Sequence, residues 1–301
     1  MPNRVNDVFR FAARETARFV AAPDESGAEL PHNRVSRALA NLQRKLSSRL
    51  ARHVALNRRR LVNSGPMVSF TFDDAAMSAG HAGAERLEKM HGRGTYYIAS
   101  GLIGRNVCPY ALMDRDSVRE LHLKGHEIAL HGHSHRAAGA LTAQEFHDDL
   151  RKNREWLEAI DEGIRPTNFA YPYGFASFAR KLQLCGLVAS TRSVAPGVIA
   201  GDFDPQFLRC VELANQRVTP DTVSAYLDAA VRLNGWLIFC SHDIADDPSP
   251  YGCTPALFQH ALDGAASRRI EIVTIAEALS RSHSVPTGPS ISIEATRSHF
   301  A

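Results

Sequence analysis

Residues 67–74 of the chain read MVSFTFDD. The middle of this stretch, residues 68–72, is rich in β-branched and aromatic side chains, which predicts a buried strand. Two adjacent aspartates, Asp73 and Asp74, follow directly at the end of that strand. An apolar strand that ends on charged residues is typical of a parallel sheet, because functional residues collect at the carboxyl ends of its strands.

Similar short runs recur along the chain, and helical patterns separate most of them. Strands are expected at residues 68–72, 95–99, 127–130, 168–171, 187–191, 236–240 and 271–274, and helices at 117–123, 142–160, 219–233 and 254–267. Thr142 lies three residues before Glu145, which predicts a capping box, and Pro220 and Pro255 each follow a threonine. This alternation implies an α/β fold with a parallel sheet, either open or closed into a barrel.

The composition is that of an ordinary globular protein. The 301 residues are 44% hydrophobic and 22% charged, and the formal net charge of +3 gives no reason to expect a nucleic-acid partner. The sequence contains no apolar run of about 18 residues, and residues 1–22 lack the pattern of a secretory signal. The cysteines are odd in number and lack a CxxC spacing, which favours a reducing, cytoplasmic compartment; they are Cys108, Cys185, Cys210, Cys240 and Cys253.

A basic amphipathic helix is expected ahead of the sheet. Residues 33–61 contain many Arg and Lys but no Asp or Glu, and the apolar residues at helical spacing are Val35, Leu39, Leu42, Leu46, Leu50 and Val54. The favoured interpretation packs this apolar face on the main domain, while the alternative is peripheral contact with an anionic membrane. The chain thus divides into a basic helical extension at 1–64, an α/β domain at 65–283 and a loosely ordered tail at 284–301.

Four groups of polar residues follow four of the expected strands, and in a parallel sheet they would meet on one face. They are Asp73-Asp74, the histidines of residues 131–135, Tyr173-Gly174 and Ser241-His242-Asp243. Two adjacent carboxylates repel each other unless a positive charge lies near, although a turn or a helix cap is an alternative role for such a pair. His131 and His135 are four residues apart, so both imidazoles can reach one ion. Two imidazoles and one carboxylate are typical of a catalytic zinc site, with Co²⁺, Mn²⁺ or Ni²⁺ as alternative ions.

From about residue 67 to residue 281, the chain resembles the NodB-homology polysaccharide deacetylases, carbohydrate esterase family 4. The resemblance rests on TFDD at 71–74, GHEIALHGHSH at 125–135, FAYPYG at 169–174 and IFCSH at 238–242. It implies a deformed (β/α) barrel of about seven strands. It also implies a metal-dependent hydrolase that removes an N-acetyl group from an amino sugar in an oligosaccharide, a polysaccharide or a lipid-linked glycan precursor.

The resemblance also assigns a role to each site residue. Asp73 matches the catalytic base, His242 the catalytic acid, and Tyr173 the residue whose backbone N–H holds the oxyanion. The metal ligands are matched by Asp74, His131 and His135. His133 falls between the ligand positions and is expected to be dispensable for metal binding.

Three positions depart from the family pattern. Ala170 stands where the family often has an arginine that pairs with the base, and Arg192 or Arg209 would have to replace it. Gly132 stands where serine or threonine is usual, so a hydrogen bond that orients the site is expected to be missing. The Asp-Trp motif that commonly tunes the acid is not recognisable.

Two other functions stay open at the level of the sequence. In an amidohydrolase-type enzyme acting on a small amide, His131 and His133 would form an HxH metal pair on a strand. A catalytically silent module would use the barrel cleft only to hold a glycan, because a fold alone does not guarantee activity.

Overall fold

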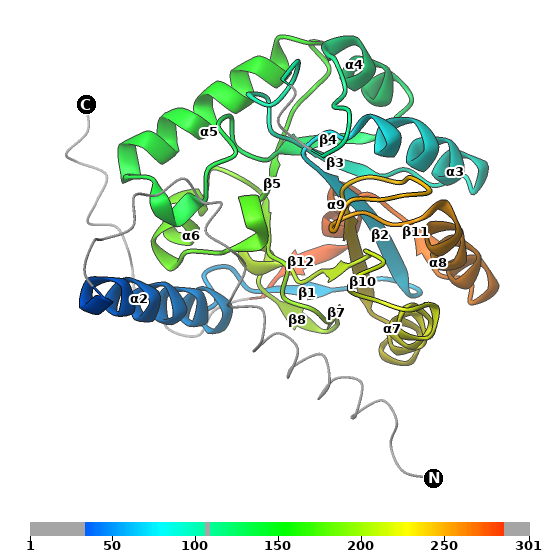
Figure 1. Cartoon of the computed structure of the whole chain (residues 1–301). Coiled ribbons are helices and arrows are strands. Elements are labelled where there is room, and N and C mark those ends of the chain that lie inside the picture. The colour runs from blue at the N-terminus through cyan, green and yellow to red at the C-terminus, as the bar shows by residue number, and fades with distance from the viewer. Residues whose placement is uncertain (1–33, 106–108, 286–301) are drawn as a thin grey trace.

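The structure is a computed structural model, and it describes residues 34–105 and 109–285. At its centre lies a sheet whose continuous path of seven strands runs in the order β6-β5-β4-β3-β2-β10-β7 (Figure 1). Neighbouring strands are parallel, except that β7 is antiparallel to β10. The strands are β2 (Met67–Asp73), β3 (Thr95–Ile98), β4 (Glu127–Leu130), β5 (Asn168–Ala170), β6 (Ser190–Arg192), β7 (Val198–Ile199) and β10 (Trp236–Ser241).

The two ends of this path curl toward each other. Two further strands, β9 (Val211–Glu212) and β11 (Glu271–Ile272), pair in parallel with β10 and β2. Arg192 at the end of β6 bridges in parallel to Leu208, shortly before β9, and the Ser193 N–H donates to the Leu208 carbonyl at 3.0 Å. The fold is therefore a deformed (β/α) barrel, as the resemblance to the deacetylase family implied.

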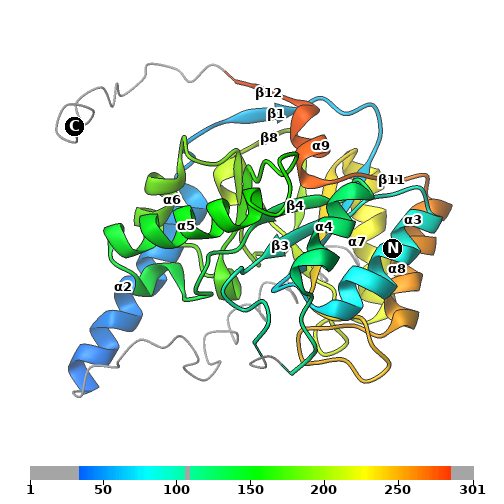
Figure 2. The ribbon, with the colours of Figure 1, turned by 90° about the horizontal axis from the view of Figure 1, so that it is seen from above.

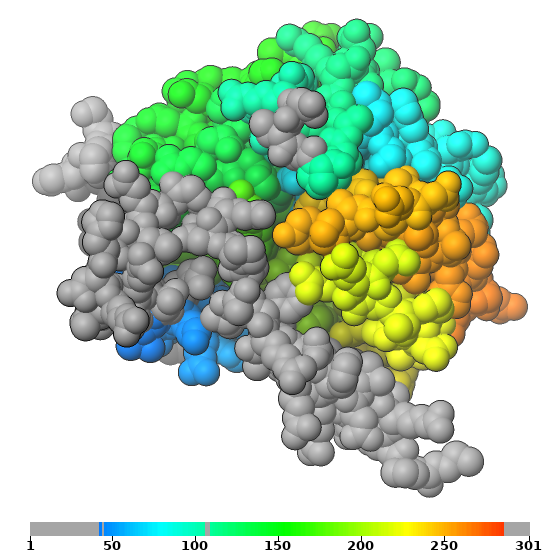
Figure 3. Space-filling model, viewed as in Figure 1, coloured from blue at the N-terminus to red at the C-terminus, as the bar shows by residue number. Residues whose placement is uncertain are grey.

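Helices follow the strands and cover the outside of the barrel (Figures 1 and 2). In the space-filling view of Figure 3, the segments from α3 to α5 (cyan to green) and those of α7 and α8 (yellow to orange) form much of the visible surface. The capping box of Thr142 and Glu145 is present, and the hydroxyls of Thr219 and Thr254 cap helices that begin at the expected prolines. The helices and turns are α3 (Ala84–Lys89), α4 (Arg115–Leu123), α5 (Ala143–Glu158), α6 (Phe178–Leu184), α7 (Pro220–Leu233), α8 (Pro255–Ser267), α9 (Ile275–Ser280), η2 (Ala79–Gly83), η3 (Ala138–Ala140), η4 (Pro172–Gly174) and η5 (Pro205–Phe207).

Two expected strands have different bounds in the structure. The strand expected at 187–191 begins only at Ser190, because Gly186 has a φ of 89° and the Leu187 N–H donates to the Leu184 carbonyl at 2.9 Å, which completes the turn after α6. The strand expected at 271–274 ends at Ile272, because Thr274 is the N-cap of α9.

Alternation along β2 sends its side chains in two directions. Outward residues stack in an aromatic layer beneath the helices, with ring centroids 5.6 Å apart for Phe70 and Phe239 and 4.9 Å apart for Phe72 and Tyr96. Met67 faces the other way, into a second core cluster inside the barrel. Asp73 lies six residues after Met67 and so shares its direction. The strand itself therefore directs the Asp73 carboxylate into the barrel.

A small antiparallel sheet, β12 (Ser282–Ser284), β1 (Arg59–Leu61) and β8 (Asp202–Phe203), closes the amino-terminal end of the barrel. Leu61 and Phe203 pack in the same cluster as Met67 and Trp236, which begin β2 and β10. The predicted tail lies outside the described residues from 286 onward, and so does Cys108. Of the described cysteines, Cys210, Cys240 and Cys253 are buried and Cys185 is exposed.

Helix α2 (Arg34–His53) packs on the main domain beside α6, as expected, but with a different face toward it. It ends at His53 rather than at residue 61, because residues 59–61 form β1. Ala51 is fully buried, whereas Leu42, Leu46, Leu50 and Val54 are 62%, 56%, 40% and 38% exposed. The prediction that these four residues pack on the domain is wrong, because another face of α2 meets α6. On that face the Ser47 hydroxyl accepts from the Phe178 N–H at 2.9 Å, and the Lys181 ammonium donates to the Ala51 and Val54 carbonyls at 2.7 Å each. The side chains of Val35 and Leu39 lie outside the described part. Within the described residues, no helix has the length and apolar character needed to cross a bilayer.

Candidate metal centre

The four polar groups meet at the carboxyl ends of β2, β4, β5 and β10, as the sequence predicted. The backbone turns sharply where β2 ends: Asp74 and Ala75 have φ values of 67° and 78°, and the Ala75 N–H donates to the Asp73 carbonyl at 2.9 Å. Non-glycine residues rarely adopt this left-handed region, and such strain is concentrated at functional sites. The turn separates the two adjacent carboxylates, so that Asp73 points into the barrel and Asp74 toward the histidines.

Asp74, His131 and His135 form one compact cluster. Their ligand atoms all lie within 4.8 Å of one another. The Asp74 Oδ1 atom lies 3.2 Å from His131 Nε2 and 2.9 Å from His135 Nε2. The i,i+4 spacing of the two histidines thus brings both imidazoles to the same carboxylate, and His135 does so with a φ of 53°.

The orientation of His131 is fixed by its neighbours. Its Nδ1 lies 2.9 Å from the Ala170 carbonyl, which can only accept, so Nδ1 carries the proton and Nε2 presents a lone pair to the cluster. Its backbone N–H donates to Asn153 Oδ1 at 3.0 Å. A carbonyl that accepts from the second ring nitrogen is the usual partner of a metal-binding histidine.

The cluster fits a divalent cation. Asp74 Oδ1 is buried and has no hydrogen-bond partner, and it faces the two imidazole Nε2 atoms. Three electron-pair donors at one point repel one another unless a positive charge lies between them. Burial raises the pKa of Asp74, but positive charge on the rings of His135 and His131, when they are protonated, outweighs it, so the pKa of Asp74 lies well below its ordinary value. The site is therefore prepared to hold positive charge.

Asp73 stays outside this cluster and binds Arg192. Arg192 Nη2 lies 2.5 Å from both carboxylate oxygens, and the guanidinium is fully buried, 5.1 Å from the centre of the Tyr97 ring. Burial opposes ionisation of Asp73, but Arg192, His131 and His242 together hold the pKa of Asp73 below its ordinary value. Of the two candidates from the sequence, Arg209 instead donates to the Pro196 carbonyl at 3.3 Å.

The register of the sheet explains why Arg192 reaches Asp73. Arg192 is paired with Ala170 on the neighbouring strand, so the two side chains leave the sheet in the same direction. The small Ala170 side chain leaves space for the guanidinium inside the barrel. An arginine one strand away thus compensates for the alanine.

We expect Arg192→Met to lower the free energy of unfolding by about 3–5 kcal/mol, because it leaves the Asp73 carboxylate buried without its cation. Urea unfolding followed by circular dichroism measures the change. Arg209→Met is the matched control and should show a much smaller loss. Equal losses in the two variants would contradict this role of Arg192. Adding Asp73→Asn to Arg192→Met should recover part of the stability, since no buried charge then remains unpaired.

His133 points away from the cluster, as expected for a residue between the ligand positions. Its Nδ1 lies 3.0 Å from the Ser100 hydroxyl oxygen. The loop itself is held by Asp149 on α5, whose carboxylate accepts from the N–H groups of His133 at 2.9 Å and Ser134 at 2.8 Å. Gly132 has a φ of 76°, and a Cβ there would lie 2.8 Å from Asp149 Oδ2. Asp149 therefore supplies orienting hydrogen bonds in a loop that lacks the usual serine or threonine.

His242 and Tyr173 border the cluster from two other strands. His242 Nε2 lies 3.8 Å from Asp74 Oδ2, and the His242 ring centre is 5.3 Å from that of Tyr251. Tyr173 has a φ of 59° in the turn after β5, and its ring centre lies 4.8 Å from that of His135. Asp243, next to His242, accepts from the backbone N–H of Ser249 at 2.8 Å and so orders the loop that follows β10.

Sequence reasoning missed two further residues of the site. The Tyr110 hydroxyl donates to Asp74 Oδ2 at 3.0 Å, and no pattern in the sequence pointed to it. Asn153 holds the His131 backbone and also donates to the Ser100 hydroxyl at 3.0 Å. The sequence did contain a sign of this role, because Asn153 is a polar residue on the buried face of α5, which also carries Phe146, Leu150 and Leu157.

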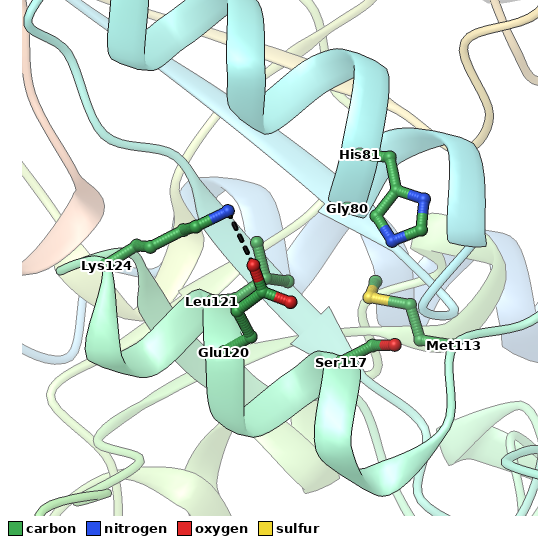
Figure 4. Close-up of a pocket in the computed structure, with 7 residues that line it drawn as sticks. All are labelled: Gly80, His81, Met113, Ser117, Glu120, Leu121 and Lys124. Carbon is green, nitrogen blue, oxygen red and sulfur yellow. Dashed lines mark ion pairs between the residues drawn. The ribbon is translucent and has the colours of Figure 1, made fainter.

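A pocket lies elsewhere, between η2 and α4 (Figure 4). Its polar edge is an ion pair in which Lys124 Nζ lies 2.8 Å from Glu120 Oε1. The residues that line it are Gly80, His81, Met113, Ser117, Glu120, Leu121 and Lys124. None of them belongs to the cluster around Asp74.

Comparisons with known proteins give a consistent result. Residues 61–184 match the family model for polysaccharide deacetylase, a range that includes the three clustered residues, Asp73 and Tyr173 but ends before Arg192 and His242. A chitin deacetylase from Colletotrichum lindemuthianum is 19% identical with a TM-score of 0.54, over 72% of this chain and 89% of that chain. A family 4 acetyl xylan esterase from Clostridium thermocellum, in complex with a cobalt ion, is 19% identical with a TM-score of 0.51, over 71% of this chain and 90% of that chain. At 19% identity, these two likenesses show that this chain has the same fold as the two enzymes. No protein with a curated description matches the sequence.

Proposed function

We propose that the chain is a metal-dependent hydrolase of the polysaccharide deacetylase family, which removes an N-acetyl group from an amino sugar in an oligosaccharide, a polysaccharide or a lipid-linked glycan; the match of residues 61–184 to the family model and the shared fold support this. The observation that carries this proposal is the division of labour between the two adjacent aspartates. Asp74 faces two imidazoles, whereas Asp73 is held outside that cluster by Arg192. A ligand set with a second, unliganded carboxylate beside it is what metal-assisted hydrolysis requires.

Asp74, His131 and His135 would hold the cation, for which Zn²⁺ is the first candidate because two imidazoles and a carboxylate leave positions open. When bound, such an ion polarises an amide carbonyl and lowers the pKa of water to roughly 7 in good zinc sites. Cobalt is a second candidate, since the acetyl xylan esterase of the same fold was solved with a cobalt ion. Tyr110 would fix the outer oxygen of Asp74 through its hydroxyl.

Asp73 would act as the general base. Its oxygen lies 4.0 Å from His131 Nε2, so it borders the space where a water molecule would attack the carbonyl carbon. Arg192 keeps the carboxylate ionised, which leaves it free to take the proton of that water. A positioned base of this kind contributes about 10²- to 10⁴-fold to the rate.

The remaining steps fall to Tyr173 and His242. Tyr173 lies in a left-handed turn at the end of β5, and its backbone N–H would hold the oxyanion, a contact worth about 3–4 kcal/mol in other hydrolases. His242, on the opposite wall, would give a proton to the departing amine nitrogen as the C–N bond breaks. Water and the N-acetyl sugar thereby yield acetate and a free amino sugar.

The position of His133 disfavours the amidohydrolase alternative. An HxH pair would need the imidazoles of His131 and His133 at one ion, but His133 contacts Ser100 and the cluster contains His135 instead. The silent glycan-binding module predicts the same fold without turnover, so measured acetate release distinguishes it.

The test is an acetate-release screen. We expect the purified protein, loaded with Zn²⁺ or Co²⁺, to release acetate from N-acetylated oligosaccharides and to lose this activity on chelation, with recovery when the ion is restored. O-acetylated xylan is the comparison substrate, because one structural neighbour is an acetyl xylan esterase. Full activity after chelation, or metal-dependent release only from the ester, would overturn the proposed N-deacetylase function.

A further inference from the structure

The outward face of α2 carries an apolar stripe. Leu42, Leu46 and Leu50 are 62%, 56% and 40% exposed, and Val54 follows the end of the helix with 38% exposure. The three leucines are four residues apart, so at about 100° per residue they lie within about 80° of one another. Aligned large aliphatic side chains that face water mark an interaction surface rather than random exposure.

A basic strip runs beside the leucines. Lys45, Arg49 and Arg52 are exposed, and on a helix they lie on the side that adjoins the stripe. Residues 33–61 contain no Asp or Glu. The exposed face of α2 thus joins an apolar half to a purely cationic half, which is the design of a helix that lies in a membrane interface.

The helix is clamped so that this face cannot turn inward. The Lys181 side chain is 1% exposed, and its ammonium lies 2.6 Å from Asp204 Oδ2 and donates to the Ala51 and Val54 carbonyls at the carboxyl end of α2. Asp204 Oδ2 also accepts from the Leu56 N–H at 3.0 Å. A buried ion pair at the carboxyl end, where a cation is favourable, therefore fixes the rotation of α2 on the barrel.

We propose that α2 docks the protein on an anionic lipid surface, with Leu42, Leu46 and Leu50 in the acyl boundary and the basic strip against the head groups. The absence of acidic residues in 33–61 favours lipid over a second copy of the chain. Two copies joined by this face would bring basic strips together without counter-charges, whereas anionic head groups neutralise them. The proposal does not depend on the proposed enzymatic function.

Vesicle binding of the full chain tests this docking. The wild type should sediment with phosphatidylcholine vesicles that contain about one quarter phosphatidylglycerol, and far less with pure phosphatidylcholine. The triple variant Leu42→Ser/Leu46→Ser/Leu50→Ser should bind about 1,000-fold more weakly, since each leucine buried in the acyl boundary changes partition about tenfold. The matched control, Leu123→Ser/Leu187→Ser/Leu233→Ser, removes leucines outside α2 that are 64%, 46% and 47% exposed, and it should bind like the wild type.

Charge and folding complete the test. Lys45→Gln/Arg49→Gln/Arg52→Gln and increased salt should each weaken binding, because exposed charges are screened by salt. All three variants should keep the wild-type Tm, since none of the replaced side chains is buried. The proposal would be overturned if the wild type did not bind anionic vesicles, or if the two leucine variants lost vesicle binding to the same extent. The proposal would also be overturned if the wild type were a dimer in solution and only the α2 leucine variant were a monomer.

Discussion

Replacing either His131 or His135 with alanine is expected to remove the metal ion and, with it, acetate release, whereas His133→Ala should keep both. The two ligand histidines each place Nε2 within about 3 Å of the same Asp74 oxygen, at 3.2 and 2.9 Å. Loss of one imidazole leaves only two protein ligands. Metal content after dialysis, measured by mass spectrometry, and acetate release are the two readouts.

The three variants form a matched set, because all remove an imidazole from the same five-residue loop. His133→Ala breaks the contact with Ser100 but leaves the Asp149 hydrogen bonds to the loop backbone intact. Addition of Zn²⁺ should raise the Tm of the metal-free wild type and of His133→Ala, and not that of the ligand variants. If His133→Ala also lost the ion while His135→Ala kept it, the HxH arrangement would be correct instead.

The sequence was sufficient for the parts of the site that depend on local pattern. Apolar runs placed β2, β4 and β10, and the rule that parallel strands present their carboxyl ends on one face brought Asp74, His131 and His242 together. The i,i+4 spacing brought His135 to His131, whereas the choice of His135 over His133 came from the resemblance to the deacetylase family. Apart from that choice, these inferences need only the period of a strand or a helical turn.

Contacts between distant segments could not be predicted in this way. The choice between Arg192 and Arg209 depends on the register of β6 against β5, which pairs Arg192 with Ala170. The two-residue strands β7, β8, β9 and β11 are too short to show any period. The pattern of α2 identified its apolar side correctly, but a single helix does not reveal which side faces the domain.

The two departures from the family pattern have a common physical explanation. At Ala170 the missing guanidinium is supplied by Arg192 from the next strand, and at Gly132 the missing side chain is compensated by Asp149 from α5. In both places a charged side chain from a neighbouring element makes the contact, with the Asp73 carboxylate in one case and with the backbone of the histidine loop in the other. What the site requires is a charge at a point in space, and the chain can deliver it from more than one element.

The second large effect is expected for Asp73→Asn, which should lower kcat by about 10²- to 10⁴-fold while the metal content stays that of the wild type. The amide keeps the shape of the carboxylate but cannot take a proton from water. Asp73 lies outside the ligand cluster, so the three metal ligands are unchanged. Acetate release per bound ion is the measurement.

Two further measurements make the Asp73→Asn result specific to proton transfer. The variant leaves the Arg192 guanidinium buried without its counter-charge, so its Tm should fall, and kinetics must be recorded well below that Tm. Asp74→Asn is the matched control on the neighbouring carboxylate and should lose the ion itself. An Asp73→Asn protein that keeps both its metal and more than about one tenth of the wild-type kcat would show that Asp73 is not the base. Loss of the ion from both asparagine variants would instead make Asp73 a ligand, and the attacking water would then need a different base.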